Sequence, residues 1–260
     1  MGEEVTSKDV HKLRTSIRRI EVALEPAGKF SGSKKLQRHL DTMRRMAGRV
    51  RDIDVQIDLL RGLHVEDYGN DCVELQNVLQ RRRAKQEKKT GARVAKEIGK
   101  GLEARLQDAA KVLEELPRTR RVANQERVEQ LRQQFIELTR EVPQDGDPLH
   151  ALRKASKRLR YRLEAIAGRE SRSLEKDMKG VQDAIGAWHD WATLTAEGEK
   201  RLAPKSIAFV SYLKSLTIAK RHEARRAVIA LRDKLTHARA GKKPPARATH
   251  DRTTHHQAAR

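Results

Sequence analysis

Two rows of basic residues, one near the start of the chain and one past its middle, have side chains suited to binding phosphate. Each row opens with a histidine, which is followed three and seven residues later by arginine or lysine. The members are His11, Arg14 and Arg18 in the first row and His150, Arg153 and Lys157 in the second. At 100° per residue each row falls on one narrow helical stripe, with its cations about 6 Å apart along the axis. Guanidinium offers phosphate oxygens a planar fork of donors, and ammonium offers a mobile point charge. One such row is most often a solvated face, but two rows of identical spacing favour a site for a linear polyanion.

The two rows belong to longer stretches that match each other. Residues 10–19 align with residues 149–158 at a constant offset of 139. A second pair of blocks, residues 48–52 and 186–190, follows in the same order at an offset of 138. These matches predict duplication of a helical unit, with chance similarity between two basic amphipathic helices as the alternative.

Apolar residues form a separate stripe beside each basic row. They are Val10, Leu13, Ile17, Ile20 and Leu24 in the first stretch, and Leu149, Leu152, Leu159 and Leu163 in the second. Such stripes predict helices that bury one face in a core and carry the cations beside it. Glu25 and Glu164, which match at the offset of 139, lie next to cations. We expect them to orient those cations and not to form a general acid/base pair.

Capping residues, prolines and glycines in the sequence predict seven helices. Their approximate ranges are 6–25, 33–62, 71–116 (with a break near 90–91 or 99–101), 122–142, 148–167, 173–200 and 204–239. A capping box at Thr6 and Asp9 opens the first helix. The clearest turn precedes the fifth, with Asp147 as N-cap and Pro148 at the first helical position. The expected fold is therefore all-α: two pseudo-twofold-related antiparallel bundles of long helices around a basic central groove or pore.

We expect a single helical domain at residues 6–240, preceded by an extension at 1–5 and followed by a disordered basic tail at 241–260. The first repeat covers about 6–142 and the second about 147–240. The tail has no apolar periodicity. It contributes little of the positive charge, so the basic character belongs to the folded part.

Composition narrows the function classes. The 260 residues carry a net charge of +21, and aromatic residues make up only 3%. One cysteine, Cys72, excludes an intrachain disulfide and makes a reducing cytoplasm the default. No run of 18 apolar residues exists, so we expect no membrane span and no membrane partner. The charge points to polyanionic partners, with nucleic acid first, and polyphosphate, inositol phosphates and anionic membranes behind it.

Catalytic and metal-binding signatures are absent from the sequence, so we expect no enzyme, no cofactor and no metal site. It contains no glycine-rich phosphate loop, nucleophile elbow or HExxH motif. The two row histidines are either half-buried structural residues at helix ends or phosphate donors that gain charge as pH falls. Asp52 and Asp190 are expected either to pair with row arginines or to form ordinary surface pairs.

The repeated His-x-x-Arg-x-x-x-(Arg/Lys)-Arg helix, the Arg-Asp-Ile-Asp-Val block at 51–55 and the Lys-Arg-Leu-Arg-Tyr block at 157–161 resemble the CHAD domain, the conserved-histidine α-helical domain. The resemblance covers about residues 5–238. It implies two helical bundles around a basic groove or pore and binding of inorganic polyphosphate at polyphosphate granules. The ligands it implies are His11, Arg14, Arg18, Arg19, Arg51, His150, Arg153, Lys157, Arg158 and Arg160. The second copy has His189 where the first has Arg51, and Ala192 where the first has Asp54.

Some relatives carry a fused triphosphate tunnel domain marked by Glu-x-Glu-x-Lys on a strand, and the nearest string here, at 197–200, has the wrong spacing. The expected function is thus that of a stand-alone, non-catalytic polyphosphate-binding protein in the cytoplasm, associated with granules. The alternatives are a nonspecific nucleic-acid binder and a metal-dependent phosphoanhydride hydrolase. Weak nucleic-acid binding at low salt is expected in any case, and an oligomer is compatible with the sequence.

Overall fold

The computed structural model describes residues 6–63, 68–115, 121–142, 146–203 and 205–240. All regular structure in this part of the chain is helical. The predicted extension at 1–5 and tail at 241–260 lie outside the described residues.

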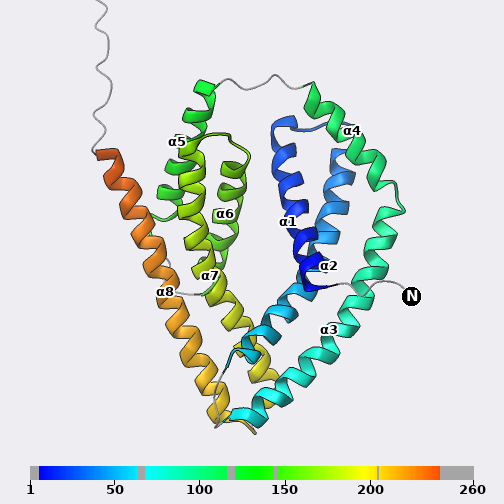
Figure 1. Cartoon of the computed structure of the whole chain (residues 1–260), viewed down its shortest axis with the longest axis vertical. Coiled ribbons are helices and arrows are strands. Elements are labelled where there is room, and N and C mark those ends of the chain that lie inside the picture. Colours follow the sequence, from blue (N-terminus) through cyan, green and yellow to red (C-terminus); the bar gives the residue numbers. More distant parts are fainter. Residues whose placement is uncertain (1–5, 64–67, 116–120, 143–145, 204, 241–260) are drawn as a thin grey trace, which may run out of the picture.

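Eight α-helices and one short 3₁₀ helix are present in the described part (Figure 1). Their bounds are α1 Ser7–Leu24, η1 Glu25–Ala27, α2 Ser33–Arg61, α3 Gly69–Ile98, α4 Leu102–Glu114, α5 Arg121–Leu138, α6 Gly146–Glu164, α7 Arg169–Leu202 and α8 Ile207–Ala240. Helices α1–α4 form one lobe and α5–α8 the other. The lobes meet at their lower ends, where α2 and α7 cross.

Local sequence signals set most helix boundaries. The predicted capping box is present, because the Thr6 hydroxyl accepts from the Asp9 backbone N–H at 3.2 Å and the Asp9 carboxylate accepts from the Thr6 N–H at 3.0 Å. The long predicted third helix breaks at residues 99–101, one of its two expected positions. Gly101 has φ +76°, a left-handed conformation that glycine adopts without steric cost, and α4 starts after it.

The start of the fifth predicted helix was wrong by two residues. Helix α6 begins at Gly146, so Asp147 and Pro148 lie inside its first turn. The first four N–H groups of a helix have no partner within it, so a proline there sacrifices no hydrogen bond. Helix α5 also ends earlier than expected, at Leu138. The next residue, Thr139, donates its hydroxyl to the Phe135 carbonyl at 2.7 Å.

The core is continuous between the lobes. One apolar cluster lies within α5–α8 and another within α1, α2 and α4. A third joins the lobes, since Ile57 of α2 and Leu75 of α3 belong to the same cluster as Leu194 of α7 and Phe209 of α8. The apolar stripes predicted beside the basic rows lie in these clusters or against them. This third cluster joins α2 and α3 of one lobe to α7 and α8 of the other.

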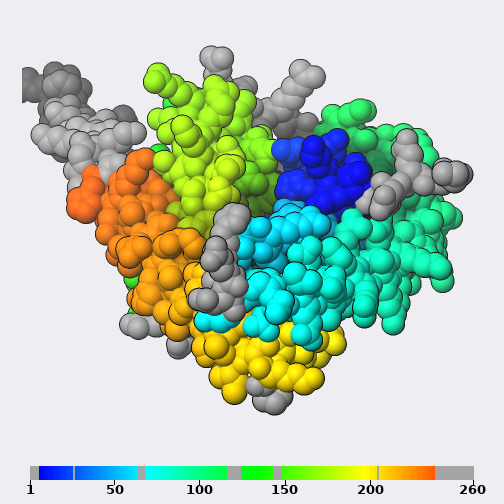
Figure 2. All heavy atoms as spheres, turned by 60° about the horizontal axis from the view of Figure 1, so that its bottom comes forward, coloured from blue at the N-terminus to red at the C-terminus, as the bar shows by residue number. Residues whose placement is uncertain are grey.

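Helices α1 and α6 contact each other where the two lobes face (Figure 1). In Figure 2 the side chains of α1, in blue, lie between those of the second lobe in yellow-green and those of α2 and α3 in cyan. Arg19 of α1 donates its Nε to Glu164 Oε1 at 2.8 Å, and Arg158 of α6 approaches Glu25 Oε1 at 3.8 Å. Each row-bearing helix is thus tied to the acidic residue that ends the other.

Candidate polyanion-binding site

The two basic rows converge where α1 faces α6, and Arg51 of α2 joins them. We call the group formed by His11, Arg14, Arg18, Arg51, Arg153 and Lys157 the central cluster. The members of the central cluster shift one another's pKa values. Burial, together with the positive charges of Arg153, Arg18 and Arg14, lowers the pKa of Lys157 to about 7. Residues 139 positions apart in the sequence therefore act on one another electrostatically.

Arg14 and Arg153 occupy matched positions in the two rows and have matched environments. Burial is the main cause of a lowered pKa at each guanidinium, and Arg18 lowers both further. Both Nε atoms are buried and have no hydrogen-bond partner. A buried donor left unpaired costs about 1–3 kcal/mol. The protein maintains this cost at two equivalent positions in the same cluster.

Imidazoles flank the central cluster on both sides. The His11 pKa is lowered, mainly by partial burial and next by the charge of Arg51. The His150 and His189 rings lie 4.8 Å apart between centroids. Burial, with the charge of Arg153, lowers the pKa of His189 to about 4. The row histidines therefore stand beside the cations in both halves, and His189 occupies the position that Arg51 has in the first half.

Two aspartates provide partial compensation of the positive charge. Asp52 Oδ1 lies 3.6 Å from Arg14 NH1, so of the two expected alternatives the pairing with a row arginine is the one present. Asp190, its counterpart at the offset of 138, has a raised pKa because it is buried, although the charges of Arg153 and Lys157 oppose that effect. These two carboxylates leave the central cluster with an excess of positive charge.

Four of the candidate ligands lie outside the central cluster: His150 flanks it, and the other three stand apart from it. Arg19 and Arg158 are exposed, with side chains 63% and 72% accessible, and pair with Glu164 and Glu25. Glu25 and Glu164 thus orient cations, as the sequence indicated. Arg160 donates to Glu175 Oε1 at 2.8 Å.

Arg160 is held against α7. Its Nε donates to Gln182 Oε1 at 3.0 Å, and its guanidinium carbon lies 4.5 Å from the centroid of the Tyr161 ring. Only 18% of its side chain is accessible. Its neighbour Lys157, one turn earlier, faces the central cluster.

Sequence reasoning missed His189 as a site residue. It noted this residue only as a departure from the first copy. The signal was nevertheless present, because His189 matches Arg51 at the constant offset of 138. Position in the repeat was a better guide here than residue type.

Among the residues that the structure describes, no group of three or more His, Cys, Asp or Glu side chains is arranged to hold a metal ion. No helix in the described ranges is long and apolar enough to cross a membrane. Cys72 is half-buried, and burial raises the pKa of its thiol. The arrangement around the central cluster is one for holding negative charge.

Comparison with known proteins identifies the family and the fold. The sequence matches the model of the CHAD domain over residues 3–198. The structure is similar to the crystal structure of the CHAD domain from the plant Ricinus communis, with a TM-score of 0.65 and 18% sequence identity, over 89% of this chain and 82% of that one. No match was found among curated protein sequences.

Proposed function

The chain belongs to the CHAD domain family, and from this membership we propose that it binds inorganic polyphosphate through the central cluster. The family as a whole is associated with polyphosphate binding. The central cluster contains the cations Arg14, Arg18, Arg153 and Lys157 of the two basic rows, whereas Arg19 and Arg158, which end the two motifs, lie outside it. The proposal therefore rests on both the family and the side chains of this chain.

The observation that carries the proposal is that two arginines at matched positions, each with an unpaired, buried Nε, lie within one group of cations that act on one another electrostatically. Like charges packed together and removed from water are unfavourable in the free protein, since each cation lowers the proton affinity of its neighbours. A bound chain of phosphates supplies both the missing acceptors and the missing negative charge. Charge-assisted hydrogen bonds of this kind contribute about 1.5–3 kcal/mol each.

We infer that the site arose by duplication of a two-helix unit, α1–α2 and α6–α7. Contacts within each unit recur at matched positions. Arg44 Nε donates to Glu21 Oε1 at 3.2 Å in the first unit, and Arg160 Nε donates to Gln182 Oε1 at 3.0 Å in the second. The partners are exchanged, but Glu21 matches Arg160 and Arg44 matches Gln182 at offsets of 139 and 138. A pseudo-twofold relation would bring the two rows face to face.

We propose binding without catalysis. The groups that surround the central cluster are mainly cations and imidazoles, and its two carboxylates, Asp52 and Asp190, face arginines. Release of inorganic phosphate from polyphosphate in the presence of Mg²⁺ or Mn²⁺ would identify the protein as a hydrolase instead. We further propose that it acts in the cytoplasm at polyphosphate granules, where a fluorescent fusion would co-localise with the polymer.

The site is tested by a fourfold variant of the central cluster, Arg14→Ala, Arg18→Ala, Arg153→Ala and Lys157→Ala. Loss of four charge-assisted contacts abolishes measurable polyphosphate binding at about 0.15 M salt. The circular dichroism spectrum should stay helical, because these side chains lie beside the apolar stripes and not within them.

A matched control removes the same charge from exposed positions of the second lobe. It carries Arg172→Ala, Lys176→Ala, Lys200→Ala and Lys205→Ala, all of which are exposed and unpaired with any carboxylate in the described part of the chain. We expect this control to bind polyphosphate nearly as the wild type does. Equal losses in the two variants would show that net charge, and not the central cluster, determines binding.

A further inference from the structure

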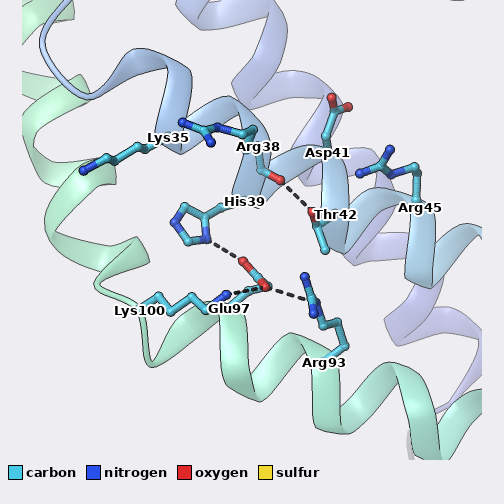
Figure 3. A pocket seen from close by; sticks show the side chains of 9 residues that line it. All are labelled: Lys35, Arg38, His39, Asp41, Thr42, Arg45, Arg93, Glu97 and Lys100. Atoms are coloured by element: carbon cyan, nitrogen blue, oxygen red, sulfur yellow. Dashed lines mark hydrogen bonds and ion pairs between the residues drawn. The ribbon is translucent and has the colours of Figure 1, made fainter.

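Three cavities follow one another along the seam between α2 and α3, outside the central cluster. The first, of about 610 Å³, is shown in Figure 3. It shares Thr42, Arg45 and Arg93 with the second cavity. The second shares Arg49 and Lys89 with the third. Together they form one continuous depression, which we call the outer groove.

The outer groove is long compared with a single phosphate group. Its α2 side runs from Lys35 to Gln56. At 1.5 Å per residue this stretch of helix is about 30 Å long. Basic residues line both sides throughout. They are Lys35, Arg38, Arg45 and Arg49 on α2, Arg82, Lys85, Lys89 and Arg93 on α3, and Lys100 just beyond it.

Polar contacts hold the two helices in register along the seam. His39 Nδ1 lies 2.6 Å from Glu97 Oε2, and the Thr90 hydroxyl donates to the Met46 carbonyl at 3.3 Å. Towards the other end, Arg83 Nε donates to Asp54 Oδ1 at 2.7 Å. Along these three contacts the residue number in α2 rises from 39 to 54 while the number in α3 falls from 97 to 83. The two helices therefore run antiparallel with a nearly constant register. The groove is a fixed feature of the hairpin.

The acidic residues of the outer groove are already engaged. Figure 3 shows Glu97 between His39, Arg93 and Lys100, which all interact with its carboxylate. Asp41 pairs with Arg44.

Many of the groove cations, in contrast, have no acidic partner. Within the described ranges no carboxylate pairs with Lys35, Arg38, Arg45, Arg49, Lys85 or Lys89. Arg45, Arg49, Lys85 and Lys89 are also exposed to solvent. The groove therefore presents a line of available positive charge.

On the α2 side this line of charge is specific to the first half of the chain. At the offset of 138, the α7 residues that match Lys35, Arg38, Arg45 and Arg49 are Ser173, Lys176, Asp183 and Ala187. One is a cation, one is acidic and two are neutral. The outer groove is thus not a by-product of the repeat that forms the central cluster, and α7 supplies an internal comparison.

The outer groove ends at the central cluster. Asp52 lines the third cavity, and its Oδ1 lies 3.6 Å from Arg14 NH1. We propose that the outer groove is a second binding segment for inorganic polyphosphate, occupied by the part of a long chain that extends beyond the central cluster. This inference rests on the proposed function. It adds that the protein grips long chains along α2 and α3 and discriminates chains by length.

The lining of the outer groove favours an inorganic chain over a nucleic acid. It contains no Phe, Tyr or Trp, its one aromatic ring, that of His39, is bound to Glu97, and Met46 and Ile53 are its apolar members. Proteins that bind single-stranded nucleic acid rely on aromatic side chains to stack the bases, at about 1–3 kcal/mol per base. A polymer that consists of phosphate alone needs only the line of donors.

The test compares a short and a long ligand, sodium tripolyphosphate and long-chain polyphosphate, by calorimetric titration of the full chain. The groove variant carries Arg45→Ala, Arg49→Ala, Lys85→Ala and Lys89→Ala. We expect it to bind tripolyphosphate like the wild type and long chains at least tenfold more weakly. Its affinity for long chains should depend less on salt, with a log–log slope smaller by about 3, from about 0.7 per lost contact.

The matched control variant, with Arg172, Lys176, Lys200 and Lys205 replaced by alanine, should retain full affinity for both ligands. Equal affinities of groove and control variants for long chains would overturn the inference and leave the proposed function standing. If the fourfold central-cluster variant still binds tripolyphosphate, the proposed function is refuted. A loss of long-chain polyphosphate affinity in the groove variant would support the outer groove even in that case. The choice of an inorganic chain would be overturned if the wild type bound single-stranded RNA and polyphosphate with equal affinity and the groove variant lost both to the same extent.

Discussion

Lys157 couples the stability of the free protein to its binding of polyphosphate. Burial and the charges of Arg153 and Arg18 lower its pKa from 10.5 to about 7. At about pH 8 only about one tenth of the free protein carries a proton on this amine. In the bound protein the negative charge of the phosphates favours the protonated form. Binding at this pH should therefore take up nearly one proton at Lys157, and calorimetry in buffers of different ionisation enthalpy measures that uptake.

The same pKa gives the cost of Lys157 to folding. Its folded-state pKa lies below its unfolded value, so the unfolded chain binds more protons between about pH 7 and 10.5. Below about pH 7 Lys157 therefore destabilises the folded state, and this destabilisation disappears as the pH rises from about 7 to 10.5. At 1.36 kcal/mol per pKa unit the penalty reaches at most about 5 kcal/mol near neutral pH and is under about 1 kcal/mol at pH 10.

Replacing Lys157 by methionine removes this penalty while it retains the length of the side chain. The variant should unfold in urea with a free energy a few kcal/mol higher than the wild type at pH 7, and with little difference at pH 10. Its polyphosphate affinity should fall, and proton uptake on binding should shrink. The matching substitution Lys176→Met at an exposed position of α7 should change none of these quantities. A Lys157→Met variant no more stable than the wild type at pH 7 would refute the argument.

Three further outcomes follow from individual contacts. Asp190→Asn keeps the shape of the side chain but removes a negative charge beside the central cluster, so polyphosphate titration should show affinity raised by up to about tenfold, and lower affinity would contradict this. Glu25→Gln together with Glu164→Gln weakens the ion pairs between α1 and α6, which are exposed; urea unfolding should show a loss of about 0.2–1 kcal/mol for each, and a much larger loss would mean that these pairs hold the lobes together. Gly198→Ala places a methyl group 3.0 Å from Leu213 Cδ1 between α7 and α8, and this crowding should outweigh the gain of about 1 kcal/mol in helix propensity, so thermal unfolding should show net destabilisation by about 1 kcal/mol with unchanged affinity of the folded protein; unchanged or higher stability would mean that the Leu213 side chain moves aside.

Features set by neighbouring residues could be predicted from the sequence. The capping box of Thr6 and Asp9 and the break at Gly101 are local signals, and the structure contains both. The matched spacing of the two rows predicted that the rows could face each other. The structure places Lys157 beside Arg14 and Arg18, in agreement with that prediction.

Features set by tertiary packing could not be predicted. Arg160 belongs to the same basic run as Lys157, but its position three residues later turns it towards Glu175 and Gln182 of α7. The outer groove depends on the register between α2 and α3. That register is set by contacts such as Asp54 with Arg83, which join residues 29 positions apart and leave no periodic signal.

The central claim is that geometry and charge density select inorganic polyphosphate. The most direct measurement is competition for the full chain between long-chain polyphosphate, duplex DNA and single-stranded RNA, at equal phosphate concentration and about 0.15 M salt. The account predicts that polyphosphate is preferred by an order of magnitude or more, and that the fourfold variant of the central cluster loses this preference. Equal or tighter binding of DNA or RNA by the wild type would contradict it.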